Sequence, residues 1–243
     1  MSRVCTLGTR VGYHQRTRLI LRAIVNRHTR PFVASAGLVF GLMLAASSQA
    51  SAQEGVPQPI GPFVVDVRGS IVPFGQNAAF AAPRGFSSSL TPALGLGVEA
   101  GAHAYLYRWR VITFGLGGSV HASLGDRSAG ELDPDPNGPT LRKRFVALSS
   151  QLSFNFGSRD GWSYISGGLG TSRYSLFALG HEGSQRRTST INYGGGARWF
   201  TSNHLALSLD LRFYALAPLA ATGTEPSSPR MTLMVFSVGA SLR

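Results

Sequence analysis

The chain has 243 residues, a formal net charge of +12 and a single cysteine, Cys5. Such a basic composition invites a nucleic-acid interpretation, but seven of the 23 basic residues lie in the first 52 positions, where no acidic residue occurs. Residues 53–243 keep 16 basic and 11 acidic side chains, a net charge of +5, and no cysteine. This argues against a nucleic-acid partner and excludes disulfide and thiolate chemistry in that part of the chain.

The first 52 residues have the pattern of a cleaved secretory signal. An arginine-rich start is followed by an apolar run from Phe32 to Ala46 and then by Ala50-Ser51-Ala52. A basic region, an apolar stretch of about 15 residues and an A-x-A site are typical of such signals, and the run is too short for a good membrane helix. We therefore predict cleavage after Ala52 and one domain over residues 53–243. Because the basic region is long, a translation start downstream of Met1 stays open.

Alternating apolar and polar residues then predict eight β-strands. The pattern is clearest at 205–214, where Leu or Phe at every second position alternates with residues that include Asp210 and Arg212. Successive side chains of a strand point to opposite faces, so one face is wholly apolar and the other carries an acid and a base. The predicted strands are 62–73, 93–106, 110–124, 143–156, 162–174, 189–200, 204–214 and 231–243.

The connections between these strands alternate in length. Long loops are predicted at 74–92, 125–142, 175–188 and 215–230, and tight turns at 107–109, 157–161 and 201–203. Short periplasmic turns and longer extracellular loops are the architecture of outer-membrane barrels. An even number of strands places both ends of the barrel at the periplasmic side.

The polar faces of the strands separate a membrane barrel from a soluble eight-stranded barrel, which alternation alone does not exclude. These faces carry mostly Gly and Ser instead of Lys and Glu, and such small residues fit the narrow interior of eight strands. The opposite faces are apolar, and aromatic residues near strand ends would form an interfacial girdle. These aromatic residues are Tyr107, Trp109, Trp162, Trp199 and Phe200. We predict an all-β fold, an eight-stranded antiparallel up-and-down transmembrane β-barrel in the cell outer membrane.

Two segments resemble a known family. The stretch from Asn192 to Phe200, a short turn and residues 205–214 look like the penultimate hairpin of the OmpA/OmpX-type small outer-membrane barrels, and residues 236–243 resemble that family's last strand. The resemblance implies an outer-membrane barrel inserted by the assembly machinery and surrounded by outer-membrane lipid and lipopolysaccharide, and it implies no single activity. The family's last strand usually ends in an aromatic residue, whereas this chain ends in Arg243, which bears on the efficiency of assembly.

Charged residues predicted to point into the barrel form the main candidate site. Three acids and three arginines share the lumen face: Asp66, Arg68, Glu99, Arg198, Asp210 and Arg212. Buried charges are costly unless they are paired, so the balanced set predicts an ion-pair network that plugs the barrel. The alternative is the selectivity filter of a low-conductance channel.

Two inward-facing histidines, His103 and His121, lie on adjacent predicted strands. A turn near Arg108 would place His103 opposite residue 113 and His121 opposite residue 95. At about 3.3 Å per residue the two would then be about 25 Å apart. They cannot share a metal ion, and we expect no metal and no cofactor.

The second long loop contains Asp133-Pro134-Asp135-Pro136-Asn137-Gly138, which matches the opening of a calcium loop. The twelfth position, where a bidentate glutamate belongs, is Arg144, so we expect a proline-stiffened acidic turn. The following basic run, Arg142, Lys143 and Arg144, lies at the predicted outer rim. These side chains would meet lipopolysaccharide phosphates there or form an ordinary solvated rim.

The sequence contains no nucleophile-elbow, phosphate-loop or spaced Cys/His motif. Lipid A-modifying barrel enzymes form the enzymatic alternative, but they need a histidine near the outer leaflet. Here His181 falls in a loop and His204 at a periplasmic turn. We therefore predict a non-catalytic barrel with a structural or surface-interaction role through its long loops. Nothing in the pattern indicates an oligomeric state or a particular loop ligand.

Overall fold

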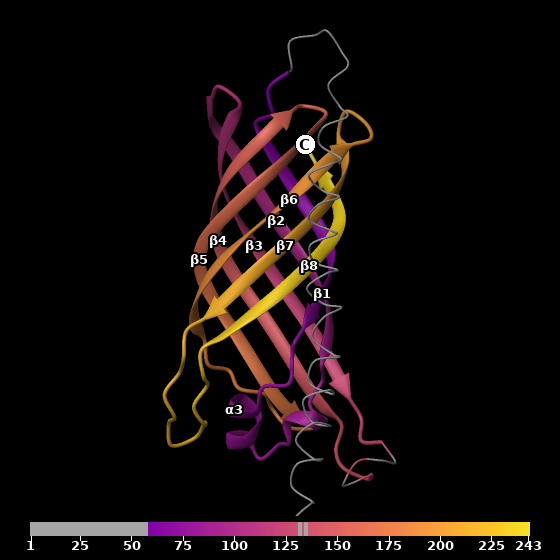
Figure 1. Cartoon of the computed structure of the whole chain (residues 1–243), viewed down its shortest axis with the longest axis vertical. Helices are drawn as coiled ribbons and strands as arrows, with labels where there is room; N and C mark the ends of the chain where they lie inside the picture. The colour runs from indigo at the N-terminus through magenta and orange to yellow at the C-terminus, as the bar shows by residue number, and fades with distance from the viewer. Residues whose placement is uncertain (1–57, 131–132, 134–135) are drawn as a thin grey trace, which may run out of the picture. The chain divides into compact units, whose positions relative to one another are not determined.

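A computed structural model describes residues 58–243 except 131–132 and 134–135. The predicted signal at 1–52 lies outside these residues. The described chain forms one closed barrel in which each strand pairs antiparallel with the next and β8 closes onto β1 (Figure 1). The predicted eight-stranded antiparallel up-and-down barrel is therefore confirmed. Its strands are β1 (Phe63–Pro73), β2 (Leu94–Trp109), β3 (Ile112–Arg127), β4 (Leu141–Ser158), β5 (Gly161–Ala178), β6 (Thr188–Phe200), β7 (Leu205–Leu216) and β8 (Met231–Leu242).

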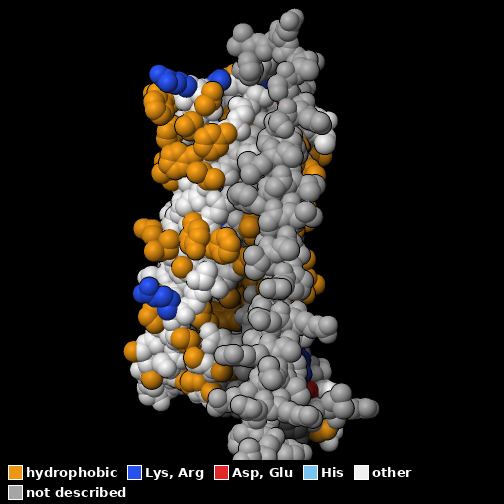
Figure 2. Space-filling view, in the orientation of Figure 1, with side chains coloured by type: hydrophobic (Ala, Val, Ile, Leu, Met, Phe, Trp, Pro, Cys, Tyr) orange, Lys and Arg blue, Asp and Glu red, His pale blue; other side chains and the backbone are white. Residues whose placement is uncertain are grey.

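The outward faces of the strands are apolar, whereas much of the inward face carries polar and charged side chains. On β7, Ser208, Asp210 and Arg212 are buried in the interior, while the leucines between them face outward. Leu96, Val98 and Leu169 on the outer wall are 63–66% exposed. Figure 2 shows patches of hydrophobic side chains on the described part of the face in view, with basic groups near its upper end and in its lower half. This inside-out distribution is opposite to that of a water-soluble barrel, whose apolar residues fill the core.

The connections alternate in length as predicted, but several strands run further than their sequence pattern indicated. The predicted turn at 107–109 is wrong, because β2 continues to Trp109 and the chain turns at Arg110 and Val111, with Arg110 at a φ of 53°. The β4–β5 turn is Arg159 and Asp160, and the β6–β7 turn covers 201–204. We call the end that carries these turns the turn end, and the opposite end the outer end.

The outer end carries four longer connections, at 74–93, 128–140, 179–187 and 217–230. The first of these contains a short helix α3 (Ala78–Ala81) and two 3-10 turns, η1 (Ala82–Arg84) and η2 (Ser88–Leu90). Figure 1 shows α3 at the end of the barrel opposite the C-terminus. Asn77 caps α3 by accepting a hydrogen bond from the Phe80 amide, as helix N-termini require.

Among the described residues, no helix is long and apolar enough to cross a membrane.

Candidate functional site

The six charged residues predicted to face the lumen lie together in its interior. Each is at most 3% exposed. Asp66 on β1 is the hub of the cluster. Arg198 on β6 donates to its two carboxylate oxygens from Nε (2.9 Å) and Nη2 (2.6 Å), and Arg68 contacts it at 2.9 Å. The Ser241 hydroxyl donates to the same carboxylate.

Arg68 links this hub to the other acids. Its Nη1 donates to Glu99 at 3.4 Å, its Nε donates to Ser208 at 3.1 Å, and its Nη2 reaches the Tyr164 hydroxyl at 3.3 Å. Tyr164 in turn donates to Asp210 at 2.6 Å. One phenol therefore connects the two halves of the network.

Arg212 pairs with Asp210, two positions earlier on the same strand. Its Nη2 lies 3.1 Å from one carboxylate oxygen and its Nε 3.2 Å from the other. Its other donors reach Asn192 on β6 and Ser166 on β5, each at 2.9 Å. The guanidinium is thereby satisfied on three strands, as a buried charge requires.

These contacts cross the lumen. β1 pairs with β2 and β8 only, yet Asp66 is held by Arg198 of β6 and Arg68 touches Tyr164 of β5. A chain of side chains thus spans the interior from one wall to the other. Eight strands enclose a space that side chains can fill, and here charged and aromatic groups fill its centre.

Sequence analysis missed the neutral members of this network. Tyr164, Ser241 and Asn192 supply hydroxyl and amide groups that the charges need. The alternation along each strand predicts that these residues point inward. It does not predict which residues they contact, because contacts across the lumen depend on how the strands are staggered.

Glycines make room for the larger groups. A Cβ at Gly117 would overlap the His103 ring, and one at Gly196 would lie 2.8 Å from the Tyr164 hydroxyl.

The outer half of the lumen is apolar instead of charged. Phe145, Tyr174 and Tyr214 form its centre, and the Phe145 ring centroid lies 6.4 Å from that of Tyr174 and 5.3 Å from that of Tyr214. The loop that contains α3 folds onto this cluster. Phe80 is 1% exposed and packs on Tyr174 at 4.8 Å, and Phe74 packs on the same ring at 5.7 Å. The first outer connection, residues 74–93, therefore acts as a stopper in the mouth, and we call it the stopper loop.

Two cations hold the stopper loop in place. Lys143 donates from Nζ to the Gly75 carbonyl oxygen at 2.7 Å. Arg84 donates to the carbonyl oxygens of Phe80 (2.7 Å) and Ser227 (3.2 Å) and to the Ser228 hydroxyl (2.8 Å), which ties the loop to the β7–β8 connection. Burial lowers the pKa of the Arg84 guanidinium, and the Glu225 carboxylate opposes this effect.

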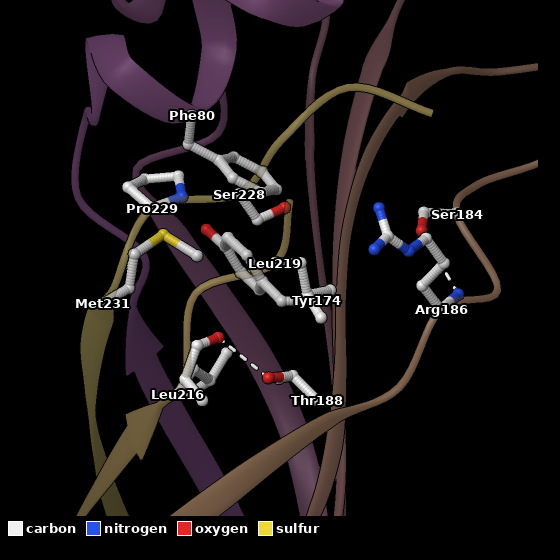
Figure 3. Close-up of a pocket in the computed structure, with 11 residues that line it drawn as sticks. Phe80, Tyr174, Ser184, Arg186, Thr188, Leu216, Leu219, Ser228, Pro229 and Met231 are labelled. Carbon is white, nitrogen blue, oxygen red and sulfur yellow. Dashed lines mark hydrogen bonds between the residues drawn. The ribbon is translucent and has the colours of Figure 1, made fainter. Parts of the chain in front are cut away.

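Figure 3 shows where these segments meet. Phe80 lies over Tyr174 beside Pro229 and Met231, with Ser184 and Arg186 on the far side. The space between them is about 10 Å³, barely enough for one water molecule. At this point in the mouth the stopper loop is therefore held by packing as well as by hydrogen bonds.

The predicted rim residues separate into two groups. Lys143 is 2% exposed and points inward with Phe145, so the predicted lipopolysaccharide contact by Lys143 is wrong. The alternation of β4 puts Lys143 and Arg144 on opposite faces. Arg142 and Arg144 face outward, and Arg142 donates to both Asp126 oxygens at 2.7 and 2.6 Å.

The two inward histidines are closer than predicted but do not meet. Because the turn lies at 110–111 and a register shift occurs between Tyr105 and Tyr107, His103 pairs with Gly117 and not with residue 113. Four positions on β3 then separate it from the level of His121, about 13 Å. His103 bonds Gln151 at 3.1 Å, whereas His121 packs between Phe145 and Tyr214. Within 58–243, apart from the undescribed positions, no group of three His, Cys, Asp or Glu residues could hold a metal ion.

The calcium-like segment is described only in part. Asp133 accepts hydrogen bonds from Arg127 at 3.1 Å and from the Gly130 amide at 2.9 Å, while Asp135 lies outside the described residues. The exposed His181 and His204 lie at opposite ends of the barrel, in the β5–β6 loop and the β6–β7 turn.

No family model and no curated protein matches the chain. Among solved structures, Neisserial surface protein A is 14% identical with a TM-score of 0.45, covering 74% of this chain and 96% of that one. Ail of Yersinia pestis is 11% identical with a TM-score of 0.40, covering 74% and 95%. OprG of Pseudomonas aeruginosa is 11% identical with a TM-score of 0.42, covering 76% and 97%. At these identities and scores the likenesses carry no argument about function.

Proposed function

We propose that this protein is an integral barrel of the cell outer membrane, exported by a signal cleaved after Ala52, with the turn end in the periplasm and the outer end at the cell surface. Support for a membrane comes from the wall of exposed apolar side chains around a polar interior. An apolar wall of this extent in water would drive aggregation. In a bilayer, the closed sheet satisfies every strand's hydrogen bonds without water.

The height of the wall supports the same proposal. Along β4 the outward face runs from the aromatic Phe156 near the turn end to the basic Arg144 near the outer end. Twelve residues at about 3.3 Å, on a strand tilted by about 40°, give a height of about 30 Å. An apolar band about 25 Å tall between interfacial residues is typical of outer-membrane barrels.

Within that membrane, the proposed role is non-catalytic: a closed barrel that anchors and presents its outer loops, with outer-membrane lipid and lipopolysaccharide around it after insertion by the assembly machinery. The observation that carries this proposal is the filled lumen. Its centre is crossed by the Arg198–Asp66 pair and its mouth is occupied by Phe80. A lumen closed at both levels leaves the connections at the outer end as the surface available to partners.

Cysteine labelling on whole cells tests this orientation. Ala221→Cys places a thiol in the exposed β7–β8 loop, and Asp160→Cys places one in the exposed β4–β5 turn. An impermeant maleimide should label position 221 on intact cells and position 160 only after the outer membrane is opened. Labelling of position 160 alone on intact cells, or equal labelling of both, contradicts the orientation. Extraction of the folded protein into buffer without detergent contradicts the membrane placement itself.

A further inference from the structure

Arginines outnumber acids on the outward face of the barrel near the outer end. Arg142, Arg144 and Arg173 all point away from the lumen near the outer end, and Asp126 is the carboxylate on the adjoining strand β3. Arg142 occupies both oxygens of Asp126. Two positive charges, on Arg144 and Arg173, are left on this wall.

These two arginines are neighbours in the sheet. Arg144 pairs with Ser175 and Val146 pairs with Arg173, so the two occupy diagonal positions on the same face. Diagonal neighbours lie about 7–8 Å apart. Each long side chain can therefore reach a group placed between them.

Both side chains have donors to spare. Arg144 is exposed and none of the described residues forms an ion pair or hydrogen bond with it. Arg173 donates from Nη1 to Gln185 at 2.5 Å, but its Nε is buried without a partner among the described residues. Because this Nε is buried, a ligand at the surface would reach Arg173 through its Nη groups.

We infer that Arg144 and Arg173 together bind the phosphate of a lipid headgroup in the outer leaflet, the phosphorylated lipopolysaccharide headgroup being the source. This rests on the proposed function, because it needs the wall to stand in that leaflet. The pair lies where the apolar wall ends, which is the level of lipid headgroups, and forked guanidinium groups match phosphate geometry. Gln185, which accepts a hydrogen bond from Arg173, is neutral and adds no negative charge beside the pair.

The test is a titration of the purified barrel, held in phosphatidylcholine vesicles, with lipopolysaccharide. The double variant Arg144→Ala/Arg173→Ala should bind about tenfold more weakly than the parent. Arg108→Ala/Arg110→Ala is the control, since it removes the same charge from exposed positions at the turn end. It should bind as the parent does. Arg144→Lys/Arg173→Lys, which keeps the charge but loses the forks, should fall between them.

Two further arms identify the source of the phosphate. Inorganic phosphate added to the same vesicles should not compete, and dephosphorylated lipopolysaccharide should bind the parent as weakly as intact lipopolysaccharide binds the alanine pair. Equal losses in the alanine pair and its control would overturn the inference, because they would show attraction by net charge alone. Failure of the parent to stay in the vesicles would instead overturn the proposed function.

Discussion

Arg198 holds both oxygens of Asp66 at a point where each side chain is at most 1% exposed. Removing one partner of a buried pair leaves an uncompensated charge, which costs about 3–5 kcal/mol. We expect Arg198→Ala to lower the free energy of unfolding in urea by an amount in this range. Arg187→Ala, which removes an exposed arginine in a loop, should leave the unfolding midpoint unchanged.

A second substitution tests whether the loss comes from the pair. Asp66→Asn in the Arg198→Ala background removes the carboxylate charge that Arg198 balanced, so part of the stability should return. An additive further loss would show that Asp66 is stabilised by other groups, such as Arg68 and Ser241. An unchanged midpoint in the single variant would show that water screens the arginine.

For single residues, the alternation of inward and outward positions along each strand was the main basis for prediction. It placed all six charges inside, because inward residues recur every second position. The same rule, applied to Lys143 beside Phe145, predicts an inward lysine, but the basic run around it suggested a solvated rim. The partner of each charge could not be predicted, since it depends on strand stagger and on neutral residues such as Tyr164.

Among the elements, β7 gives the most direct test of the lipid-facing wall. Leu209 faces outward between the buried Ser208 and Asp210. An arginine on the lipid face near the bilayer midplane costs about 2–4 kcal/mol. Leu209→Arg should reduce the free energy of unfolding in lipid vesicles by that amount, whereas Ala221→Arg in the exposed β7–β8 loop should have no effect. Similar stability of the two variants would mean that β7 does not face lipid.

The stopper loop is the element that sequence analysis did not anticipate. Its residues appeared only as a polar connection, and a helix of four residues leaves no periodic signal. Phe74 and Phe80 reveal their role only when the mouth is assembled around Tyr174. Strand ends were also misplaced, because β4 and β5 extend beyond the alternating segments as far as Leu141 and Ala178.

Trypsin digestion tests whether the stopper loop depends on Phe80. Phe80→Ala removes the ring that packs on Tyr174 and beneath Arg84, so the loop should open more often. Cleavage after Arg84 should then be faster than in the parent protein. Phe63→Ala, which removes a 53% exposed ring on the outer wall, is the control and should leave the rate unchanged. Equal cleavage rates in all three proteins would contradict a packed stopper.

For the whole molecule, periodicity and loop length were sufficient to predict the barrel. Eight alternating segments with alternately short and long connections leave few other closed arrangements, and the structure has that topology. The packing across the lumen is a different kind of property. It arises from contacts between β1 and β6, and between the stopper loop and β5, which are distant in the sequence. No local pattern encodes such contacts, so the sequence left a plug and a channel as alternatives.

The central claim is that this lumen is closed, and recordings across a planar lipid bilayer test it directly. The parent protein should insert without producing discrete conductance steps, because the Arg198–Asp66 pair crosses the centre and Phe80 fills the mouth. Reproducible, ion-selective steps from the parent protein, with selectivity that shifts towards cations in Arg212→Ala, would contradict the closed barrel and identify the charged cluster as a filter.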